Sequence, residues 1–345
     1  MGSESRNRYL LKNTLIFTLG NIGSRMISFF LIPLYTNVLT TSQYGTVDLI
    51  TTISTVAGPM LTLNIAESVM RFGLDKDADK EKNTQCGSIV LLIAMIIGLV
   101  LIPICRCITE VSDYAMYVYF YVISLSASQL FLCDLRGKEL LLKYSLGNIL
   151  QTLMIAILNI TFLLVFKMET GGYLLAYIIA NFIVAIYAII AGKGYKAFSF
   201  HNIDRCKLKE MIRYSVVLIP NTFMWWIMNS SDRVMVTYMI GAAANGIYAV
   251  SYKLPTLVST LTGIFNQAWS YSAIREEGTS DETEYNNKMF KTLSAIAFMM
   301  GIGLLLLTKP FLGVYVADSY YDAWKYTPFL IIGCVYLTLG TFMAT

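Results

Sequence analysis

Besides Glu67 at the cytoplasmic end of one span, five charged side chains lie within stretches of sequence that are otherwise apolar enough to cross a membrane. They are three cations and two carboxylates: Arg25, Arg233, Lys253, Asp48 and Asp232. A charge inside a bilayer costs at least about 2.5 to 3.5 kcal/mol on insertion scales, so such residues usually pair or face a water-filled cavity. A guanidinium suits bidentate contact with phosphate or carboxylate, and a buried carboxylate can exchange a proton or a small cation.

Polar residues repeat at helical spacing around these charges, so each charge shares one helix face with neutral hydrogen-bonding groups. The stripes are Thr14, Thr18, Asn21, Arg25 and Ser28; Asp48, Thr51, Thr52, Thr55 and Thr62; Asn221, Trp225, Asn229 and Asp232, with Arg233 at the edge; and Lys253, Thr256, Thr260 and Gln267. Four such stripes are what a water-filled cavity requires. The residues expected to line it are Arg25, Asn21, Ser28, Asn221, Trp225, Asn229, Arg233 and Lys253.

Each charge also has a structural interpretation. Arg25 lies roughly 16 Å or more from either end of its span at about 1.5 Å per residue, too deep to reach the interface easily. It either faces a cavity or forms a structural ion pair. Asp232, Arg233 and Lys253 form either a local charge cluster or part of a substrate site. Asp48 lies near the start of its helix, where the helix dipole lowers the cost of a carboxylate.

The composition is that of an integral membrane protein. Of 345 residues, 56% are hydrophobic and 14% charged, against about a quarter charged in soluble domains. The mean hydropathy is +0.59. A net charge of +4 spread over such a chain does not indicate nucleic acid. The six cysteines and the single His201 form no metal-ligand pattern, and no loop is long enough for a nucleotide-binding or catalytic domain. We therefore expect no cofactor, no metal and no enzymatic activity.

Ten stretches have the length of about 20 residues that a membrane-spanning helix needs. They are Thr14 to Val38, Thr46 to Met70, Gly87 to Cys105, Tyr114 to Leu132, Tyr144 to Phe166, Tyr173 to Ala191, Tyr214 to Ile240, Gly246 to Ile274, Thr292 to Leu307 and Thr327 to Ala344. With the N-terminus in the cytoplasm, 19 Lys and Arg residues fall on the cytoplasmic side and 4 on the other. This asymmetry favours that orientation.

An internal repeat relates the two halves of the chain. Laying Gly45 over Gly246 superposes two hairpins that both enter from the cytoplasm, which predicts parallel repeats. We expect an N-terminal lobe of six helices at 1–192, a basic cytoplasmic linker at 193–213, and a C-terminal lobe at 214–345 with four helices. Because the chain stops at the end of a span, "VYLTLGTFMAT", we expect the second lobe to be incomplete by at least two helices.

Two hairpins carry a resemblance to a known family. "KNTLIFTLGNIGSRMISFFLIPLYTNVLTTSQYGTVDLI" resembles the first helical hairpin of bacterial polysaccharide flippases, including the YG turn and the acidic residue after it. "GIYAVSYKLPTLVSTLTGIFNQAWSYSAIRE" is similar to the corresponding hairpin of their second lobe. These flippases belong to the multidrug/oligosaccharidyl-lipid/polysaccharide exporter (MOP) superfamily. Its members have twelve or fourteen helices in two lobes around a central cavity and alternate access between the two sides.

The resemblance implies transport of undecaprenyl-diphosphate-linked sugar repeat units to the outer leaflet of the bacterial inner membrane, for O-antigen, capsule or exopolysaccharide assembly. Arg25, with Arg233 and Lys253, would attract the diphosphate, and Asp48 or Asp232 would bind a coupling H+ or Na+. The partners would be the lipid-linked oligosaccharide, membrane lipid and polysaccharide assembly proteins. Two alternatives stay open: an ion-coupled multidrug or organic-cation antiporter of the same superfamily, and a membrane-embedded polysaccharide polymerase.

Overall fold

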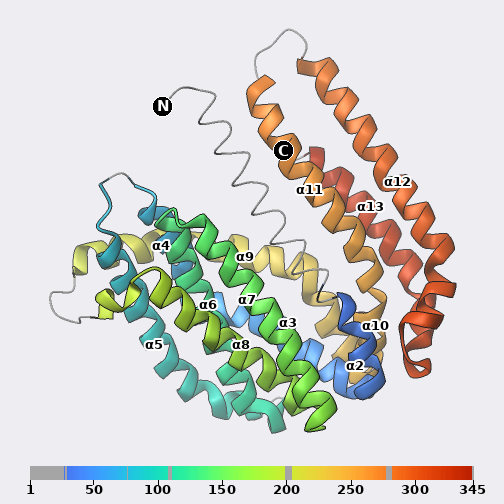
Figure 1. Cartoon of the computed structure of the whole chain (residues 1–345), viewed down its shortest axis with the longest axis horizontal. Coiled ribbons are helices and arrows are strands. Elements are labelled where there is room, and N and C mark those ends of the chain that lie inside the picture. The colour runs from blue at the N-terminus through green and yellow to red at the C-terminus, as the bar shows by residue number, and fades with distance from the viewer. Residues whose placement is uncertain are drawn as a thin grey trace. The chain divides into compact units, whose positions relative to one another are not determined.

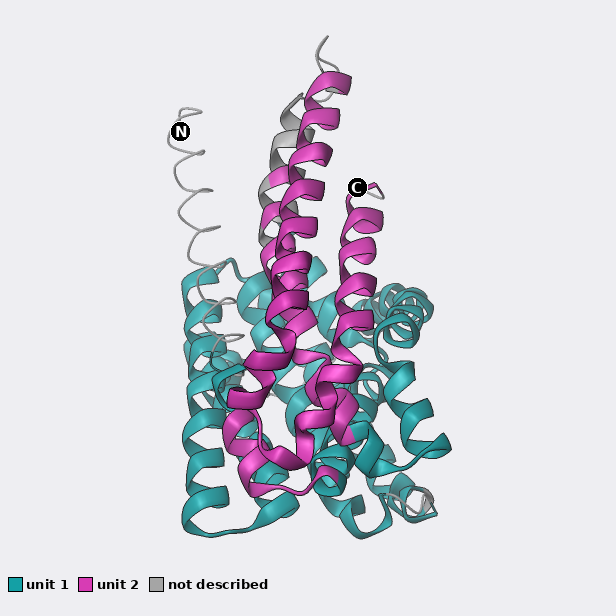
Figure 2. Cartoon of the chain, turned by 90° about the vertical axis from the view of Figure 1, so that its right-hand side faces the viewer, with its two compact units in different colours: residues 1–31, 42–245 teal, residues 32–41, 246–345 magenta. Residues whose placement is uncertain are grey.

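The computed structural model describes residues 27, 29–75, 77–107, 111–198, 204–276 and 282–343. Every regular element among these residues is a helix (Figure 1). The chain forms two compact units (Figure 2). The first comprises Met1–Leu31 and Ser42–Asn245, and the second Ile32–Thr41 and Gly246–Thr345.

The first unit holds most of the helices. They are α3 (Thr41–Leu61), α4 (Ile65–Gly73), α5 (Lys80–Arg106), η1 (Ser112–Tyr114), α6 (Ala115–Gly137), α7 (Leu141–Ile160), η2 (Thr161–Val165), α8 (Glu169–Ala191), η3 (Gly194–Phe198), α9 (Arg205–Met239) and the first part of α10 (Ala242–Ser251). The division into lobes at 193–213 stays a prediction; α9, which it assigns to the second lobe, belongs to the first compact unit.

The candidate membrane spans of the described residues match at most seven of the ten predicted ones. Among the described residues, five helices are long and apolar enough to cross a membrane, or up to seven if each bent pair counts as one span. The five are Lys80–Pro103, Ser112–Gly137, Leu141–Val165, Glu169–Ala191 and Thr283–Tyr315. Three predicted spans have no counterpart among these candidates. The first of them lies mostly outside the described residues, and the others are the seventh and eighth predicted spans. Those two correspond to helices that carry polar stripes, α9 and the pair α10 and α11 (Lys253–Glu276).

The core of the first unit gathers around α4. Ile65 and Val69 of α4 belong to one buried cluster with Leu130 of α6, Val184 of α8 and Met211 of α9. Since these side chains come from segments far apart in the sequence, apolar packing holds α4 against the rest of the unit.

Two glycines bring α4 and α6 into close contact. A Cβ atom on Gly137 would lie 3.0 Å from the Val69 carbonyl oxygen and 3.2 Å from Cα of Gly73. Small residues of this kind allow membrane helices to approach at the backbone.

The predicted second span is broken rather than continuous. α3 and α4 meet at an angle of 60°. Pro59 lies near the end of α3, and Leu63 and Asn64 follow with φ values of 51° and 54°, in the left-handed region that non-glycine residues rarely adopt. The Asn64 amide bonds back to the Pro59 carbonyl at 2.7 Å, five residues earlier, instead of continuing the helical ladder. The chain therefore changes direction within the span.

The second unit contains α2 (Ile32–Val38), the end of α10, α11, α12 (Glu282–Tyr315), η4 (Asp318–Lys325) and α13 (Thr327–Met343). Trp269 of α11 stacks on Phe342 of α13 with 5.0 Å between ring centroids. The fully buried Tyr320 of η4 donates its hydroxyl to the Leu39 carbonyl at 3.0 Å. This bond links η4 to the residue that follows α2.

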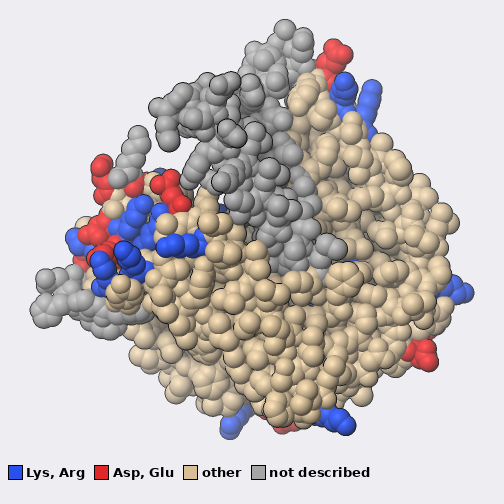
Figure 3. Space-filling model, viewed as in Figure 1, with Lys and Arg blue, Asp and Glu red and all other residues tan. Residues whose placement is uncertain are grey.

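The surface matches a protein surrounded by lipid. Four ion pairs of the first unit gather where α4 ends and where α5 and α9 begin: Arg71 with Asp75, Lys82 with Asp79, Lys196 with Glu81 and Lys207 with Glu210. Figure 3 shows charged side chains gathered over this region, at the left of the view. Apolar side chains such as Ile96 and Val100 of α5 are exposed instead. Exposed apolar side chains over the length of a span are typical of a lipid-facing surface.

Candidate functional site

Asp48 is a buried carboxylate on α3. Its side chain is 7% exposed, and it lies two turns after the helix begins at Thr41. A buried carboxylate is costly unless it is paired and hydrogen-bonded, so its partners define the site.

Arg233 of α9 is the ion-pair partner of Asp48. Its Nη1 donates to Asp48 Oδ1 at 2.9 Å, and its side chain is 19% exposed. The neighbouring Asp232 accepts a hydrogen bond from the Arg233 backbone amide at 2.9 Å. The Arg233 carbonyl in turn accepts from the Thr237 hydroxyl at 2.8 Å. The cation is therefore held by a carboxylate on another helix while part of it stays accessible.

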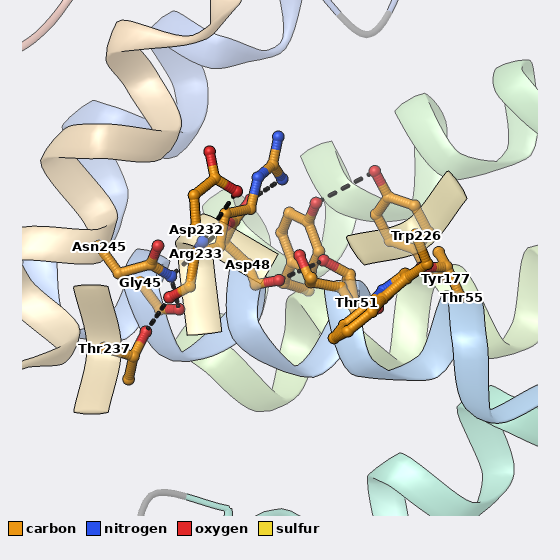
Figure 4. Close-up of polar contacts among 12 residues, drawn as sticks. Gly45, Asp48, Thr51, Thr55, Tyr177, Trp226, Asp232, Arg233, Thr237 and Asn245 are labelled. Atoms are coloured by element: carbon orange, nitrogen blue, oxygen red, sulfur yellow. Dashed lines mark hydrogen bonds and ion pairs between the residues drawn. The ribbon is translucent and has the colours of Figure 1, made fainter. Parts of the chain in front are cut away.

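Asn245 of α10 completes the cluster. Its Nδ2 donates to the Gly45 carbonyl at 2.9 Å and approaches Asp48 Oδ2 at 3.4 Å. Asn245 is fully buried, and its Oδ1 has no hydrogen-bond partner among the described residues. Figure 4 shows Asp48 approached by Arg233 from α9 and by Asn245 from α10. These contacts join the first turns of α3 and α10 to the C-terminal part of α9. The ion pair between Asp48 and Arg233 lies at their centre.

A second contact between α3 and α9 lies two turns along α9 from Arg233. The indole Nε1 of Trp226 donates to the Thr52 carbonyl at 2.9 Å, and Phe223 stacks on the Trp226 ring. Nearer the break in the span, Asn64 Nδ2 donates to the Thr222 hydroxyl at 3.2 Å. Thr222, Trp226 and Arg233 thus mark the face of α9 that contacts α3 and the break.

The predicted stripe of α9 lies on a different face of the helix. Asn221, Trp225 and Asn229 are exposed, with Trp225 at 53%, and Asn229 donates to the Trp225 carbonyl at 2.7 Å. Asp232 is half-buried between the two faces. Lys253 begins α11 in the second unit and is half-buried. The remaining predicted site residues lie outside the described ones: Asn21, Arg25 and Ser28.

The structure therefore joins two residues that the sequence singled out, Asp48 and Arg233, and adds two others. Trp226 lies seven residues before Arg233, the spacing of two helical turns, and this spacing is the signal that could have identified it. Asn245 lies in the short uncharged turn "GAAANG". Nothing in the sequence around it indicates that its side-chain amide contacts Gly45 and Asp48.

Chemically, the cluster is a neutralised charge pair whose carboxylate and guanidinium come from two different helices. No group of three or more His, Cys, Asp or Glu residues in the described part of the chain could hold a metal ion.

A comparison with models of protein families identifies the family of this chain. The family model described as "Polysaccharide biosynthesis protein" matches residues 10–271, a range that contains Asp48, Arg233 and Asn245. No curated protein sequence matches the chain.

Solved structures of MATE transporters have a similar fold. A point mutant of the Vibrio cholerae MATE transporter VcmN is 13% identical, with 99% of this chain and 87% of that chain covered and a TM-score of 0.57. The MATE multidrug transporter DinF-BH in complex with R6G is 14% identical, with 99% and 85% covered and a TM-score of 0.54. At these identities the likeness shows the fold, and the predicted all-α membrane fold is confirmed. The chain belongs to the polysaccharide biosynthesis protein family, and its fold is that of the MATE transporters of the MOP superfamily.

Proposed function

We propose that this protein is a flippase that carries undecaprenyl-diphosphate-linked sugar repeat units from the inner to the outer leaflet of the bacterial inner membrane by alternating access. The translocated repeat units would then be used for O-antigen, capsule or exopolysaccharide assembly. The observation that carries the proposal is the match to the polysaccharide biosynthesis family over residues 10–271. The excess of Lys and Arg in alternate loops supports a cytoplasmic N-terminus.

The Asp48–Arg233 pair supports a role for anion binding in the transport cycle. A diphosphate offers Arg233 more oxygen acceptors than one carboxylate, and charge-assisted bidentate contacts are among the strongest hydrogen bonds. When the diphosphate takes Arg233 from Asp48, the carboxylate is left buried and unpaired, and it binds the coupling H+ or Na+. Substrate binding and cation uptake are thereby linked at one site. Asp232, one residue from Arg233, is the second candidate for the coupling ion.

The exposed face of α9 would bind the sugar. Trp225 offers a flat aromatic ring, and Asn221 and Asn229 offer amide groups one turn on either side of it. Arg25 and Lys253 are proposed as further cations for the diphosphate, with Asn21 and Ser28 as neutral donors on the Arg25 stripe. The prenyl tail would remain in lipid.

The test is translocation in proteoliposomes, with a fluorescent undecaprenyl-diphosphate-linked oligosaccharide that is quenched only in the outer leaflet. We expect protein-dependent equilibration between leaflets. Arg25→Ala should slow it about 10- to 100-fold, the loss expected for one hydrogen bond to a charged group. Arg106→Ala removes an exposed arginine outside the stripes and serves as the control. Full transport by Arg25→Ala at normal expression would show that Arg25 has no cavity role.

A second candidate function is an ion-coupled antiporter for organic cations, because the solved structures with this fold include a multidrug transporter. Such a substrate would use the carboxylate of Asp232 and the ring of Trp225 instead of the arginines. Uptake of ethidium by the same proteoliposomes under a proton or sodium gradient distinguishes the two. Ethidium transport without lipid translocation would favour the antiporter.

A further inference from the structure

A cavity of the first unit lies where α4 ends and where α5 and α9 begin, in the region where charged side chains gather in Figure 3. Its volume is about 370 Å³, within the roughly 300 to 1,000 Å³ typical of small-molecule sites. Most of the residues that line it are charged: Asp75, Asp77, Asp79, Asp204, Lys82 and Lys207. With four aspartates and two lysines, the lining has an excess of negative charge.

The positive groups of this lining already have carboxylate partners. Lys82 Nζ lies 3.3 Å from Asp79 Oδ2, and Lys207 Nζ lies 3.1 Å from Glu210 Oε2. The helix N-termini of α5 and α9 are occupied as well, because Asp79 accepts from the Lys82 backbone amide at 3.1 Å and Asp204 from that of Lys207 at 3.0 Å. These contacts disfavour an anion as the ligand.

Carboxylate oxygens of the lining remain available to a cation. Asp77 is exposed and forms no ion pair with any described residue. Asp75 uses Oδ1 for Arg71 at 2.6 Å and Asp204 uses Oδ1 for its helix cap, which leaves the second oxygen of each as an acceptor. The carboxylates do not converge on one point, since the described residues include no acidic group arranged to hold a metal ion. The lining therefore favours an extended cation over a single metal ion.

Asn83 adds a buried amide to the cavity. It lies in the first turn of α5 and is 2% exposed, and neither its Nδ2 nor its Oδ1 has a hydrogen-bond partner among the described residues. A buried amide without partners carries a cost in free energy that a bound hydrogen-bonding ligand would offset. Asn83 is thus a second sign of a ligand, independent of the aspartates.

We propose that this cavity, the aspartate pocket, binds a linear polyamine, a chain of ammonium groups joined by methylene segments. The ammonium groups would donate to the aspartates and to the Asn83 amide oxygen, and the methylene segments would contact Phe72, which also lines the cavity. Because the aspartates come from the α4–α5 loop and from the residue before α9, the ligand would link these two segments. The proposal does not depend on the proposed function, since binding can be measured without transport.

The experiment is a calorimetric titration of the purified full chain, in a neutral detergent at low ionic strength, with spermidine and separately with MgCl₂. We expect saturable spermidine binding that added NaCl weakens, and at least about tenfold weaker binding of Mg²⁺. Asp77→Asn should raise the dissociation constant for spermidine about 2- to 5-fold, the effect of one exposed ion pair. Asn83→Ala should raise it about 10-fold, the loss expected for one hydrogen bond to a charged group.

A matched control lies in the same unit outside the cavity. Asp113 of η1 is an exposed aspartate, so Asp113→Asn removes the same charge and should bind spermidine as the wild type does. Asp77→Asn changes an exposed side chain, and it tests the pocket even where Asn83→Ala fails to fold. Absence of saturable spermidine binding, or equal affinity for spermidine and Mg²⁺, would show that the aspartates are only a solvated surface and would overturn the proposal. Wild-type affinity in Asp77→Asn would overturn it as well.

Discussion

Arg233 and Asp48 are 185 residues apart in the chain, yet their charged groups lie 2.9 Å apart within one compact unit. The pair fastens the C-terminal part of α9 to the first turns of α3, and Asn245 holds the opposite oxygen of the carboxylate. Because the carboxylate is the more buried partner, removing the arginine should cost more than removing both charges together.

The ion pair can be tested by a double-mutant cycle. Arg233→Ala leaves Asp48 buried and unpaired and should lower the free energy of unfolding by about 3–5 kcal/mol. The double variant Asp48→Asn with Arg233→Ala should recover most of this loss. Thermal unfolding in detergent, followed by tryptophan fluorescence, measures both. Effects that simply add would mean that the two side chains are not coupled.

Asn245 should respond differently to two small substitutions. Asn245→Ala removes the bond to the Gly45 carbonyl and should cost about 1 kcal/mol. Asn245→Asp is nearly isosteric but brings a second carboxylate next to Asp48, so it should be the more harmful of the two. The exposed Asn37 is the control, and Asn37→Ala should change stability by less than about 0.5 kcal/mol. Equal stability of the aspartate variant and the wild type would contradict the observed contact.

The two adjacent tryptophans of α9 should have separable effects. Trp226→Phe removes the indole donor to the Thr52 carbonyl while keeping an aromatic ring, and should lower stability by about 1 kcal/mol. Trp225 is exposed, so Trp225→Phe should leave the melting temperature unchanged but slow oligosaccharide translocation. Paired melting and transport assays on both variants check this. Slower translocation by Trp226→Phe at unchanged stability, together with a lower melting temperature for Trp225→Phe, would contradict the roles that we give to the two faces of α9.

The close crossing of α4 and α6 predicts a contrast between two glycines. Gly137→Ala places a methyl group against the Val69 carbonyl and should destabilise by about 1–3 kcal/mol. A methyl group on Gly303 of α12 would meet no described atom within 4 Å, so Gly303→Ala should stabilise the helix by about 0.5–1 kcal/mol. Melting temperatures of the two variants, measured side by side, should move in opposite directions.

Helical periodicity and apolar length were enough to predict the all-α membrane fold and the spans from α5 to α8. The break at Leu63 and Asn64 was not predicted, because Thr46 to Met70 is apolar enough to be read as one span. Pro59 was the local signal, yet a proline within a membrane helix more often bends it than ends it.

The candidate site was harder to predict from the sequence for a physical reason. Periodicity identifies which residues share a face, but it does not determine which face meets another helix. It favoured the face of Asn221, Trp225 and Asn229, whereas Trp226 and Arg233 make the contacts with α3. The partner of Asp48 depends on tertiary packing between segments that the sequence separates by 185 residues.

We propose that this protein translocates a lipid-linked sugar through contacts with its diphosphate. The most direct measurement compares the translocation rates of two probes with the same prenyl chain and sugar, one joined by a diphosphate and one by an uncharged linker. We predict that the diphosphate probe crosses at least about tenfold faster, as one charge-assisted contact would provide, and that Arg233→Ala reduces this preference. Equal rates for the two probes, or no protein-dependent translocation of either, would contradict the proposed function.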